Sequence, residues 1–377
     1  MLSPICVPVL IILVLVSARC CPKRFVKFAV AKVPGASWQQ GDILPEDVQD
    51  SHKRAPLVSG IPDVGEIMFH KYRLDMDTGP ADTPVPQGER TLKLLQWNMF
   101  LGQNLDALMA TCQRIHQVEH LDLIILSEDN IFCITSEEDM DKNECRSTGA
   151  AIARAIGMDY MFVPMYYRKN KKGQRNGCYG ASILSKQALQ DPVAIQSPMQ
   201  PAVVLKVLKE HGVEGCRYFP YAEFEIPGLP RFGIASVHLP SCGQLKELLF
   251  QAEGLCEELN RKNVHAMIIA GDMNIFAFMM RYVPFAGRKD LVCSCKSEHN
   301  EFRRVMHRNE FQDPFKNSNG THQSLPGKLD WIFVNSAFAC KRCEMERRSK
   351  PAEKQPSDHL YSFVELVASA PASQTHM

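Results

Sequence analysis

The sequence lacks an excess of charge of either sign. Across 377 residues, 43 lysines and arginines stand against 42 aspartates and glutamates, which gives a formal net charge of +1. This balance argues against a protein that wraps nucleic acid through its overall charge, although a local basic surface is compatible with it. Apolar residues make up 45% of the chain and charged residues 23%, which excludes a wholly disordered chain. The length fits one large domain or two smaller ones.

The sequence also lacks the motifs of several large enzyme classes. It contains no Gly-rich Walker loop, no G-x-S-x-G elbow and no H-E-x-x-H. These motifs build sites for nucleotide phosphates, for a nucleophilic serine and for zinc, respectively. Nucleotide-driven motors, serine hydrolases and zincins therefore have no support in the sequence, and no internal repeat is visible.

The apolar run at residues 5–16 is too short to span a bilayer comfortably, and small residues stand where it ends, at positions 16–18. This pattern is typical of a secretory signal peptide. No basic residue precedes the run, whereas four follow it: Arg19, Lys23, Arg24 and Lys27. By the positive-inside rule, an uncleaved segment would leave the body of the protein in the cytosol, where Cys20 and Cys21 would suit S-palmitoylation. We expect residues 1–18 to direct a secreted or lumenal protein; the alternative is a membrane anchor through residues 5–21.

Fourteen cysteines are many for a chain of this length. In an oxidising compartment, the pair Cys340 and Cys343 and the region of Cys293 and Cys295 can supply disulfide partners. A zinc site built from these cysteines with His299 has weaker support, because the spacings of the two pairs are unlike. The sequon at Asn319 is the only ordinary N-glycosylation sequence, and it agrees with secretion.

The chain divides into an N-terminal arm, one main domain and a tail. Residues 19–90 lack strong periodicity and end in a polar, Pro-rich stretch, so we interpret them as a loosely structured arm and linker. The domain covers residues 91–368, and residues 369–377 form a tail. Strands are predicted at 92–97, 121–127, 179–185, 232–238, 266–270, 329–334 and 361–367. Helices are predicted at 105–119, 146–156 and 243–261. Several strands are apolar on both faces, which indicates buried sheets covered by helices.

Polar residues stand at the ends of these predicted strands. The strand at 266–270 is followed by Gly271, Asp272 and Asn274. If the extended backbone continued, the side chains at 272 and 274 would project to the same side. Taken alone, the stretch is equally consistent with an Asp-turn that satisfies loop backbone groups. The other boundary residues of this kind are Asn98, Glu128, His238, Asp330, Asp358 and His359.

These residue types fit the hydrolysis of a phosphate ester. Hard divalent cations such as Mg²⁺ take carboxylate and amide oxygens as ligands. A phosphate bound to such a cation is activated for attack when a base orients water and polar donors hold the phosphoryl oxygens. A histidine beside a carboxylate can carry positive charge close to that phosphate.

The ordered set of motifs resembles the endonuclease/exonuclease/phosphatase superfamily, which includes deoxyribonuclease I, neutral sphingomyelinases and inositol-polyphosphate 5-phosphatases. The matching segments, in chain order, are LLQWNMF, LDLIILSED, YGASILS, IASVHLPS, IIAGDMN, KLDWIFV and PSDHLYSFVEL. They span residues 92–367, and the region before YGASILS looks closest to a bacterial-type branch of unassigned substrate. The resemblance implies a four-layer α/β sandwich, with two mixed β-sheets packed face to face and helices on the outer faces.

The resemblance also implies a metal and a nucleophilic water. Glu128 would be the principal Mg²⁺ ligand, with Asn98 and Asp358 close to the metal and Mn²⁺ as a substitute. Asp272 would orient or deprotonate the attacking water. Asn274 would hold that water or a phosphate oxygen.

Further residues are implied to act on the phosphate. His359, oriented by Asp330, would stabilise the phosphorane-like transition state, or serve as the base in some accounts of the family. His238 would donate to a phosphate oxygen. It argues against the abasic-site endonucleases, another branch of the superfamily, which carries Tyr at this place. Ala181 replaces an Asn that relatives of the bacterial-type branch often have, which puts one auxiliary contact in doubt.

The substrate is less well defined than the chemistry. The stretch RKNKKGQR at residues 168–175 holds five basic residues in eight, and we expect Arg175 to contact substrate. A solvated loop explains the same stretch equally well. The leading hypothesis is a nuclease-type phosphodiesterase acting as a monomer, with nucleic acid as substrate. The alternatives are a sphingomyelinase-like or phosphoinositide phosphoesterase, and a catalytically inactive binding module with the same fold.

Overall fold

The computed structural model describes residues 55–58, 60–73, 90–134, 144–169, 173–198, 214–241, 245–275, 288–315, 320–321, 328–346 and 356–369. The predicted signal segment at residues 1–18, the anchor alternative and the sequon residue Asn319 lie outside these ranges. No helix within them is both long and apolar enough to cross a membrane.

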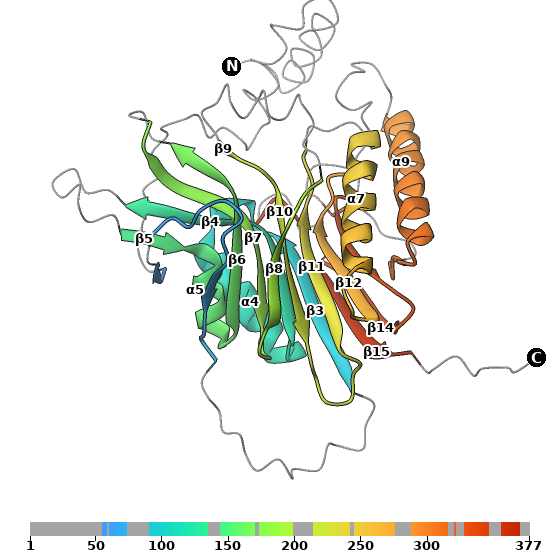
Figure 1. The fold of residues 1–377 in the computed structure, drawn as a ribbon, viewed down its shortest axis with the longest axis horizontal. Helices are drawn as coiled ribbons and strands as arrows, with labels where there is room; N and C mark the ends of the chain where they lie inside the picture. The colour runs from blue at the N-terminus through green and yellow to red at the C-terminus, as the bar shows by residue number, and fades with distance from the viewer. Residues whose placement is uncertain are drawn as a thin grey trace, which may run out of the picture.

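Two mixed β-sheets form the centre of the molecule (Figure 1). The first sheet has the order β14-β15-β3-β4-β7-β6-β2; in addition, β5 pairs with β4, β1 pairs with β5, and β9 pairs with β6. Its strands are β1 (Leu57–Val58), β2 (Met68–His70), β3 (Thr91–Asn98), β4 (Leu123–Ile134), β5 (Glu144–Ser147), β6 (Asp159–Lys169), β7 (Arg175–Ser185), β9 (Glu214–Gly215), β14 (Phe338–Met345) and β15 (Ser362–Ala368). The second sheet has the order β13-β12-β11-β10-β8. Its strands are β8 (Gln190–Gln196), β10 (Tyr218–Phe224), β11 (Phe232–His238), β12 (Ala266–Asp272) and β13 (Asp330–Val334).

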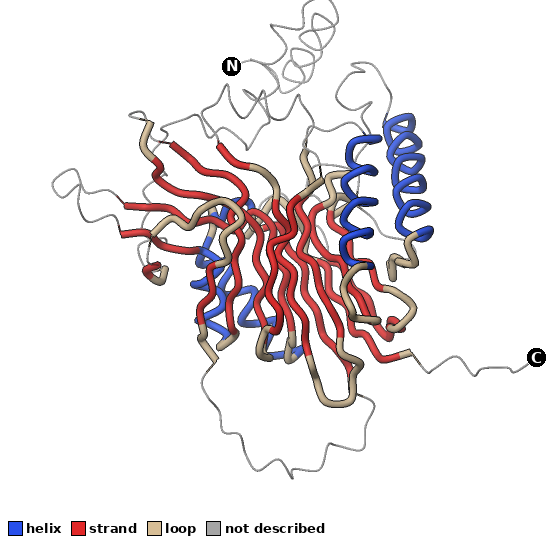
Figure 2. The backbone as a smooth tube through the Cα atoms, in the orientation of Figure 1, coloured by secondary structure: helices blue, strands red, loops and turns tan. Residues whose placement is uncertain are grey.

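Helices cover the outer face of each sheet (Figure 2). The helices α4 (Leu105–Glu119) and α5 (Thr148–Ile156) pack on the first sheet, and a short 3-10 turn, Phe100–Gly102, precedes α4. The helices α7 (Leu245–Asn260) and α9 (Arg288–Arg308) lie on the second sheet. A third apolar cluster fills the space between the two sheets. This arrangement confirms the predicted four-layer α/β sandwich.

The two-sided apolar strands follow from this layering, as β12 shows. Ala266, Ile268 and Ala270 belong to the cluster between the sheets. Met267 and Ile269 point the opposite way and pack in the cluster that contains α7 and α9. Because side chains alternate along a strand, a sheet covered on both faces needs apolar residues at every position.

Several elements extend or add to those that the sequence predicts. Helix α4 and strand β11 have the predicted bounds, whereas β4 continues past its predicted end to Ile134. The strands β6, β10 and β14 and the helix α9 were not predicted. Within the segment interpreted as an arm, β1 pairs with β5 and β2 pairs with β6, so these short pieces belong to the first sheet.

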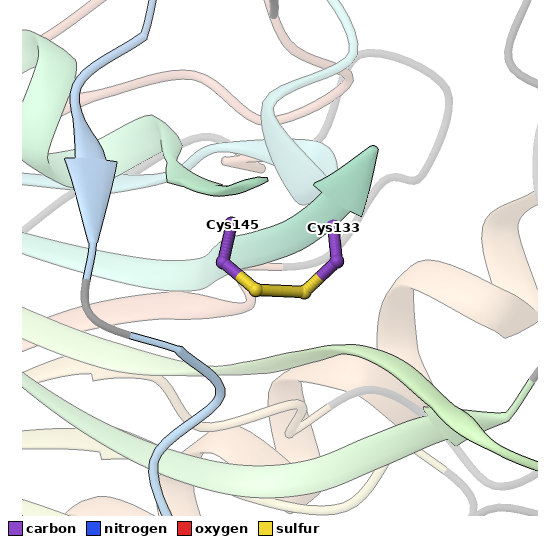
Figure 3. The surroundings of a disulfide bond; sticks show 2 residues. All are labelled: Cys133 and Cys145. Carbon is purple, nitrogen blue, oxygen red and sulfur yellow. A yellow bond between two sulfur atoms is a disulfide. The ribbon is translucent and has the colours of Figure 1, made fainter. Parts of the chain in front are cut away.

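One disulfide joins Cys133 on β4 to Cys145 on β5, at directly paired positions of the antiparallel ladder (Figure 3). The expected partners Cys340 and Cys343 are free thiols, and the side chains of Cys293 and Cys295 lie outside the described residues. The zinc alternative also finds no support at His299. Its Nε2 lies 2.8 Å from the carbonyl oxygen of Ile275, and its ring packs edge-on against Trp331.

Candidate active site

The side chains between the two sheets change from apolar to polar at one end. Strands β3 and β4 run parallel, as do β11 and β12, so the carboxyl ends of each pair lie together. On β12, the inward-facing row of Ala266, Ile268 and Ala270 continues at the same spacing to Asp272, which pairs directly with Asp330 on β13. The buried polar residues gathered near this end include Gln96, Asn98, Ser127, His238, Asp272 and Asp330.

Asp272 uses its two carboxylate oxygens differently. Oδ1 accepts a hydrogen bond from the backbone N–H of Asn274 (2.9 Å), which is the Asp-turn that the sequence allowed. Oδ2 accepts a hydrogen bond from Nδ2 of Asn98 (2.9 Å). Asn274 has a left-handed backbone (φ 50°), so the strand does not continue through it, and its Nδ2 donates to the carbonyl of Leu239 (2.9 Å). One carboxylate therefore serves both the turn and the polar cluster.

Asp330 and His359 form a buried hydrogen-bonded pair. Nδ1 of His359 lies 2.7 Å from Oδ2 of Asp330, whose other oxygen accepts from Nε2 of Gln96 (2.8 Å). Trp97 fixes the backbone by donating from Nε1 to the carbonyl of His359 (2.9 Å). Burial disfavours a charged imidazole, but the charge and hydrogen bond of Asp330 outweigh it and raise the pKa of His359 to about 10. His359 is therefore a cation at neutral pH.

Two imidazoles in different charge states, those of His359 and His238, lie close to the carboxylate of Asp272. Nε2 of His359 and Nε2 of His238 each lie 3.9 Å from Oδ2 of Asp272. Burial, followed by the charges of Arg217 and His359, lowers the pKa of His238 well below its usual value. Burial and then the charge of Asp330 raise the pKa of Asp272 to about 7. The site thus combines a cationic histidine, a neutral histidine and a carboxyl group that titrates near neutrality.

Glu128 reaches this cluster because β4 contains a β-bulge. The pairing of β4 with β7 shifts register between Ser127 and Asp129, and Glu128 has a left-handed backbone (φ 55°). Before the bulge, Leu123 and Ile125 pack between the sheets; after it, Ile131 packs on the side of α4 and α5. The extra residue therefore reverses the alternation of faces. Oε1 of Glu128 lies 3.9 Å from Nε2 of His238.

The neighbouring Asp129 points away from the cluster and is fully buried against α5. Its Oδ1 accepts hydrogen bonds from Oγ1 of Thr148 (2.8 Å) and from the N–H groups of Gly149 and Asn130 (2.7 Å each). Its Oδ2 accepts from the hydroxyl of Tyr160 (2.7 Å). A Cβ at Gly149 would lie 2.0 Å from Oδ2 of Asp129, so only glycine fits there. These contacts attach the bulge to the first turn of α5.

Two carboxylates of the site are partly open to solvent. The side chain of Glu128 is 24% exposed and that of Asp358 is 33% exposed, against 2% for Asp272. Burial, followed by the charge of Asp358, raises the pKa of Glu128. Oδ1 of Asp358 lies 4.0 Å from Nε2 of His359. Like charges held together in this way favour a bound cation.

The buried Asp272, Asp330 and His359 can also hold a metal ion, because they offer ligand atoms within 4.8 Å of one another. Within that group, however, both oxygens of Asp330 accept hydrogen bonds, one of them from Gln96 and the other from His359. A cationic His359 has no lone pair for a metal. Glu128 and Asp358 offer carboxylate oxygens of the kind that a hard cation such as Mg²⁺ takes as ligands.

Arg175 is the one predicted site residue for which the structure shows contacts elsewhere. Its guanidinium stacks over the ring of Tyr167 at 3.6 Å from the centroid and pairs with Asp63 (Nη1 to Oδ1, 2.9 Å). Tyr167 belongs to the apolar cluster of α4 and α5, on the face of the first sheet opposite the second sheet.

Sequence reasoning missed several residues that support the site. Gln96 could have been found, because it stands two residues before Asn98 on one strand and so faces the same way. Thr321 accepts from the N–H of Asp330 at its Oγ1 (2.9 Å), and Arg217 donates from Nη1 to the carbonyl of His238. These two lie outside every predicted strand and helix, so no periodicity marked them.

No family model and no curated protein matches this sequence. Solved structures do match it. An endonuclease/exonuclease/phosphatase from Beutenbergia cavernae is 16% identical with a TM-score of 0.53, and the match covers 74% of this chain and 72% of that one. A mannosyl-6-phosphatase from Bacteroides thetaiotaomicron is 18% identical with a TM-score of 0.45, covering 73% and 99%. TDP2 from D. rerio, in complex with a single-strand DNA product, is 13% identical with a TM-score of 0.45, covering 74% and 99%.

The first of these matches carries the assignment of the fold. Its TM-score of 0.53 over 74% of this chain is a similarity of fold, and the two mixed sheets seen here are the ones that the resemblance implied. The chain therefore has the deoxyribonuclease I-like fold of the endonuclease/exonuclease/phosphatase proteins.

Proposed function

We propose that the chain is a Mg²⁺-dependent hydrolase of phosphate esters, most simply a phosphodiesterase. The observation that carries this proposal is the convergence of two histidines in opposite charge states on Oδ2 of Asp272. A structural cluster has no need of a cationic and a neutral imidazole on one buried carboxylate. Hydrolysis of a phosphate ester uses all three groups.

Each residue has a role that follows from its contacts. Asp272, with a pKa raised to about 7, orients water and accepts its proton near neutral pH. The cationic His359, held by Asp330, stabilises negative charge on the phosphoryl oxygens of the transition state. The neutral His238 donates one hydrogen bond to a phosphate oxygen, and Asn274 fixes the turn that aims Asp272.

Glu128 and Asp358 are the residues that we propose hold Mg²⁺, with Mn²⁺ as a substitute. The bound ion would polarise a phosphoryl oxygen as a Lewis acid. Asn98 has a different role, since its Nδ2 donates to Asp272 and its Oδ1 accepts from the N–H of Phe100 (2.9 Å). It orients the carboxylate beside the metal ligands.

Proteins with this fold act on different phosphate esters, so we propose a class of substrate and not a single compound. A nuclease is the leading subtype, and a sphingomyelinase-like or phosphoinositide phosphoesterase is the alternative. A catalytically inactive binding module is disfavoured because the charged residues of the cluster are all in place around Asp272.

A substrate panel tests the proposal. Purified protein is assayed on DNA, RNA, sphingomyelin and inositol phosphates, with Mg²⁺ and with EDTA. We expect Mg²⁺-dependent turnover of at least one class, and its loss in Glu128→Ala and in His359→Ala. Turnover that persists in both variants would contradict the assignment of the site, and the absence of any turnover by folded wild-type protein would favour the binding module.

We also propose a secreted or lumenal location, with a membrane anchor as the alternative. The apolar run at residues 5–16 and the Cys133–Cys145 disulfide support it, because disulfides persist in oxidising compartments. Secreted protein should begin near Arg19 and carry a glycan at Asn319, as read by mass spectrometry. Full-length, unglycosylated protein in a membrane fraction would establish the anchored form.

A further inference from the structure

The two arginines that bound the basic stretch at residues 168–175 lie on opposite faces of the first sheet. Along β6, Tyr166 packs with the cluster that contains the second sheet, and the next residue, Tyr167, packs with α4 and α5. Arg168 follows and contacts Tyr179, which also belongs to the side of the second sheet. Arg175 stacks on Tyr167 instead. Arg168, and not Arg175, therefore faces the side of the sheet that holds the candidate active site.

Arg168 lies near the strand that carries Glu128, and no carboxylate is hydrogen-bonded to it among the described residues. Its guanidinium carbon is 5.7 Å from the centroid of the Tyr179 ring, and Tyr179 pairs with Asn130, two residues beyond Glu128 on β4. Glu128 is close enough for its charge to act on Arg168. Among the residues that the structure describes, Arg168 forms no ion pair with a carboxylate within 4.0 Å. A partly buried guanidinium in this position is suited to an anion that arrives from outside.

The surroundings of Arg168 continue as a cationic and aromatic wall toward His238. The rings of Tyr179 and Tyr166 lie 5.2 Å apart, and the buried Arg217 lies over Tyr166 at 5.3 Å from the centroid. Arg217 then donates to the carbonyl of His238. The wall therefore leads from Arg168 to His238, whose Nε2 lies 3.9 Å from Oδ2 of Asp272, and it carries two positive charges.

We propose that Arg168, supported by Tyr179, binds a second phosphate of the substrate, next to the phosphate that is hydrolysed. This inference rests on the proposed phosphoesterase function and narrows its substrate class to esters with at least two phosphates. A planar guanidinium binds phosphate oxygens through paired N–H groups, and Tyr179 restricts its orientation. A phosphocholine ester fits poorly, because its quaternary ammonium would lie next to this arginine.

The second phosphate can come from a neighbouring nucleotide or from an inositol ring. Both sources present the same chemistry to Arg168, and matched substrates separate them. The nucleotide pair is the p-nitrophenyl ester of thymidine 5′-phosphate with and without a 3′-phosphate. The inositol pair is inositol 4,5-bisphosphate against inositol 5-phosphate.

The test compares Arg168→Gln with Arg175→Gln in the full chain, because both variants remove one positive charge at an end of the same basic stretch. We expect Arg168→Gln to lose about tenfold in kcat/KM, chiefly through KM, on the two-phosphate member of one pair, the scale of one charge-assisted hydrogen bond. Its rate on the one-phosphate member should stay within about twofold of wild type, and Arg175→Gln should be near wild type on both. The pair that shows the difference identifies the source of the second phosphate.

A binding measurement removes the dependence on turnover. The affinity for thymidine 3′,5′-bisphosphate or inositol 4,5-bisphosphate in EDTA, by calorimetry, should fall about tenfold in Arg168→Gln and remain unchanged in Arg175→Gln. Equal losses in the two variants, or an equal loss on one-phosphate and two-phosphate compounds, would overturn the second-phosphate site. Wild-type turnover that is insensitive to EDTA and to Glu128→Ala would instead overturn the phosphoesterase function itself.

Discussion

At the scale of single residues, the candidate site depends on carboxylates that each serve two partners. Asp272 accepts a hydrogen bond from the N–H of Asn274 on one oxygen and a hydrogen bond from Asn98 on the other. Asp330 accepts a hydrogen bond from Gln96 on one oxygen, and its other oxygen contacts the imidazole of His359. Both carboxylates are buried, so neither can rotate without leaving a polar group unpaired. Their orientation is therefore fixed before any substrate binds.

The replacement Asp330→Asn tests the role of this fixed charge. The amide keeps the shape of the side chain but removes the negative charge that raises the pKa of His359 to about 10. The imidazole should then be mostly neutral at pH 8, and the rate should fall by about 10²–10⁴ at that pH. NMR titration of the histidine ring, assigned with His359→Gln, follows the change. An unchanged His359 titration in Asp330→Asn would show that another group holds its proton.

At the scale of elements, the bulge in β4 decides which acid faces the site. Glu128 and Asp129 are adjacent, and regular alternation from Leu123 onward would turn Asp129 inward and Glu128 toward the helices. The structure shows the reverse, because Glu128 takes the extra position and Asp129 is bound by the first turn of α5. We infer that this attachment holds the bulge in place.

Asp129→Asn tests this attachment, with Asp122→Asn as its matched control. Asp122 is a buried acid just before β4, and it accepts hydrogen bonds from Arg90 (2.8 Å) and from the N–H of Lys93 (2.9 Å). Both variants should lower the melting temperature. Only Asp129→Asn should weaken Mn²⁺ binding, by about tenfold, because the partners of Asp129 orient Glu128, the proposed metal ligand. Equal Mn²⁺ affinities in the two variants would show that the bulge does not depend on Asp129.

The sequence predicted the elements with strong apolar patterns and the residues at their ends. Strand β11 and helix α4 were predicted to the residue, and the polar residues of the cluster were named from their places at strand ends. The sequence does not reveal which face of the sheet a side chain takes after a β-bulge, because one inserted residue reverses the alternation of faces along the strand. The basic stretch at residues 168–175 drew attention to Arg175, but its composition does not show that Arg168 and Arg175 lie on opposite faces of the sheet. Strand β14 was missed because it is an edge strand in which only one of eight side chains is buried.

At the scale of the whole molecule, α9 connects the outer layer to the ends of β12 and β13, which carry Asp272 and Asp330. His299 on α9 contacts the carbonyl of Ile275, three residues after Asp272, and packs against Trp331, the neighbour of Asp330. Burial lowers the pKa of His299 to about 4, so the folded protein keeps this imidazole neutral where the unfolded chain protonates it. The link between the layers should therefore weaken in acid.

The sign of this effect can be checked with His299→Gln, which keeps a side-chain donor for the carbonyl of Ile275. A histidine whose folded pKa is depressed makes the free energy of unfolding decrease as pH falls from about 6.5 to about 4. Above pH 6.5 the imidazole of His299 is neutral in both the folded and the unfolded state, so it adds no pH dependence to the free energy of unfolding. The stability of the variant relative to wild type should therefore rise by up to about 3 kcal/mol across this window, as measured by urea unfolding at several pH values. A difference independent of pH would contradict the burial of a neutral His299.

The central claim is that Asp272 orients water for attack on a metal-bound phosphate ester, and Asp272→Asn tests it most directly. The amide keeps the hydrogen-bonding positions of the turn but cannot accept a proton from water. With bis(p-nitrophenyl) phosphate as substrate, wild-type protein should turn over in Mg²⁺ and stop in EDTA. We predict that Asp272→Asn binds Mn²⁺ within about threefold of wild type yet loses about 10³-fold or more in kcat. A variant that keeps the wild-type kcat would contradict the account.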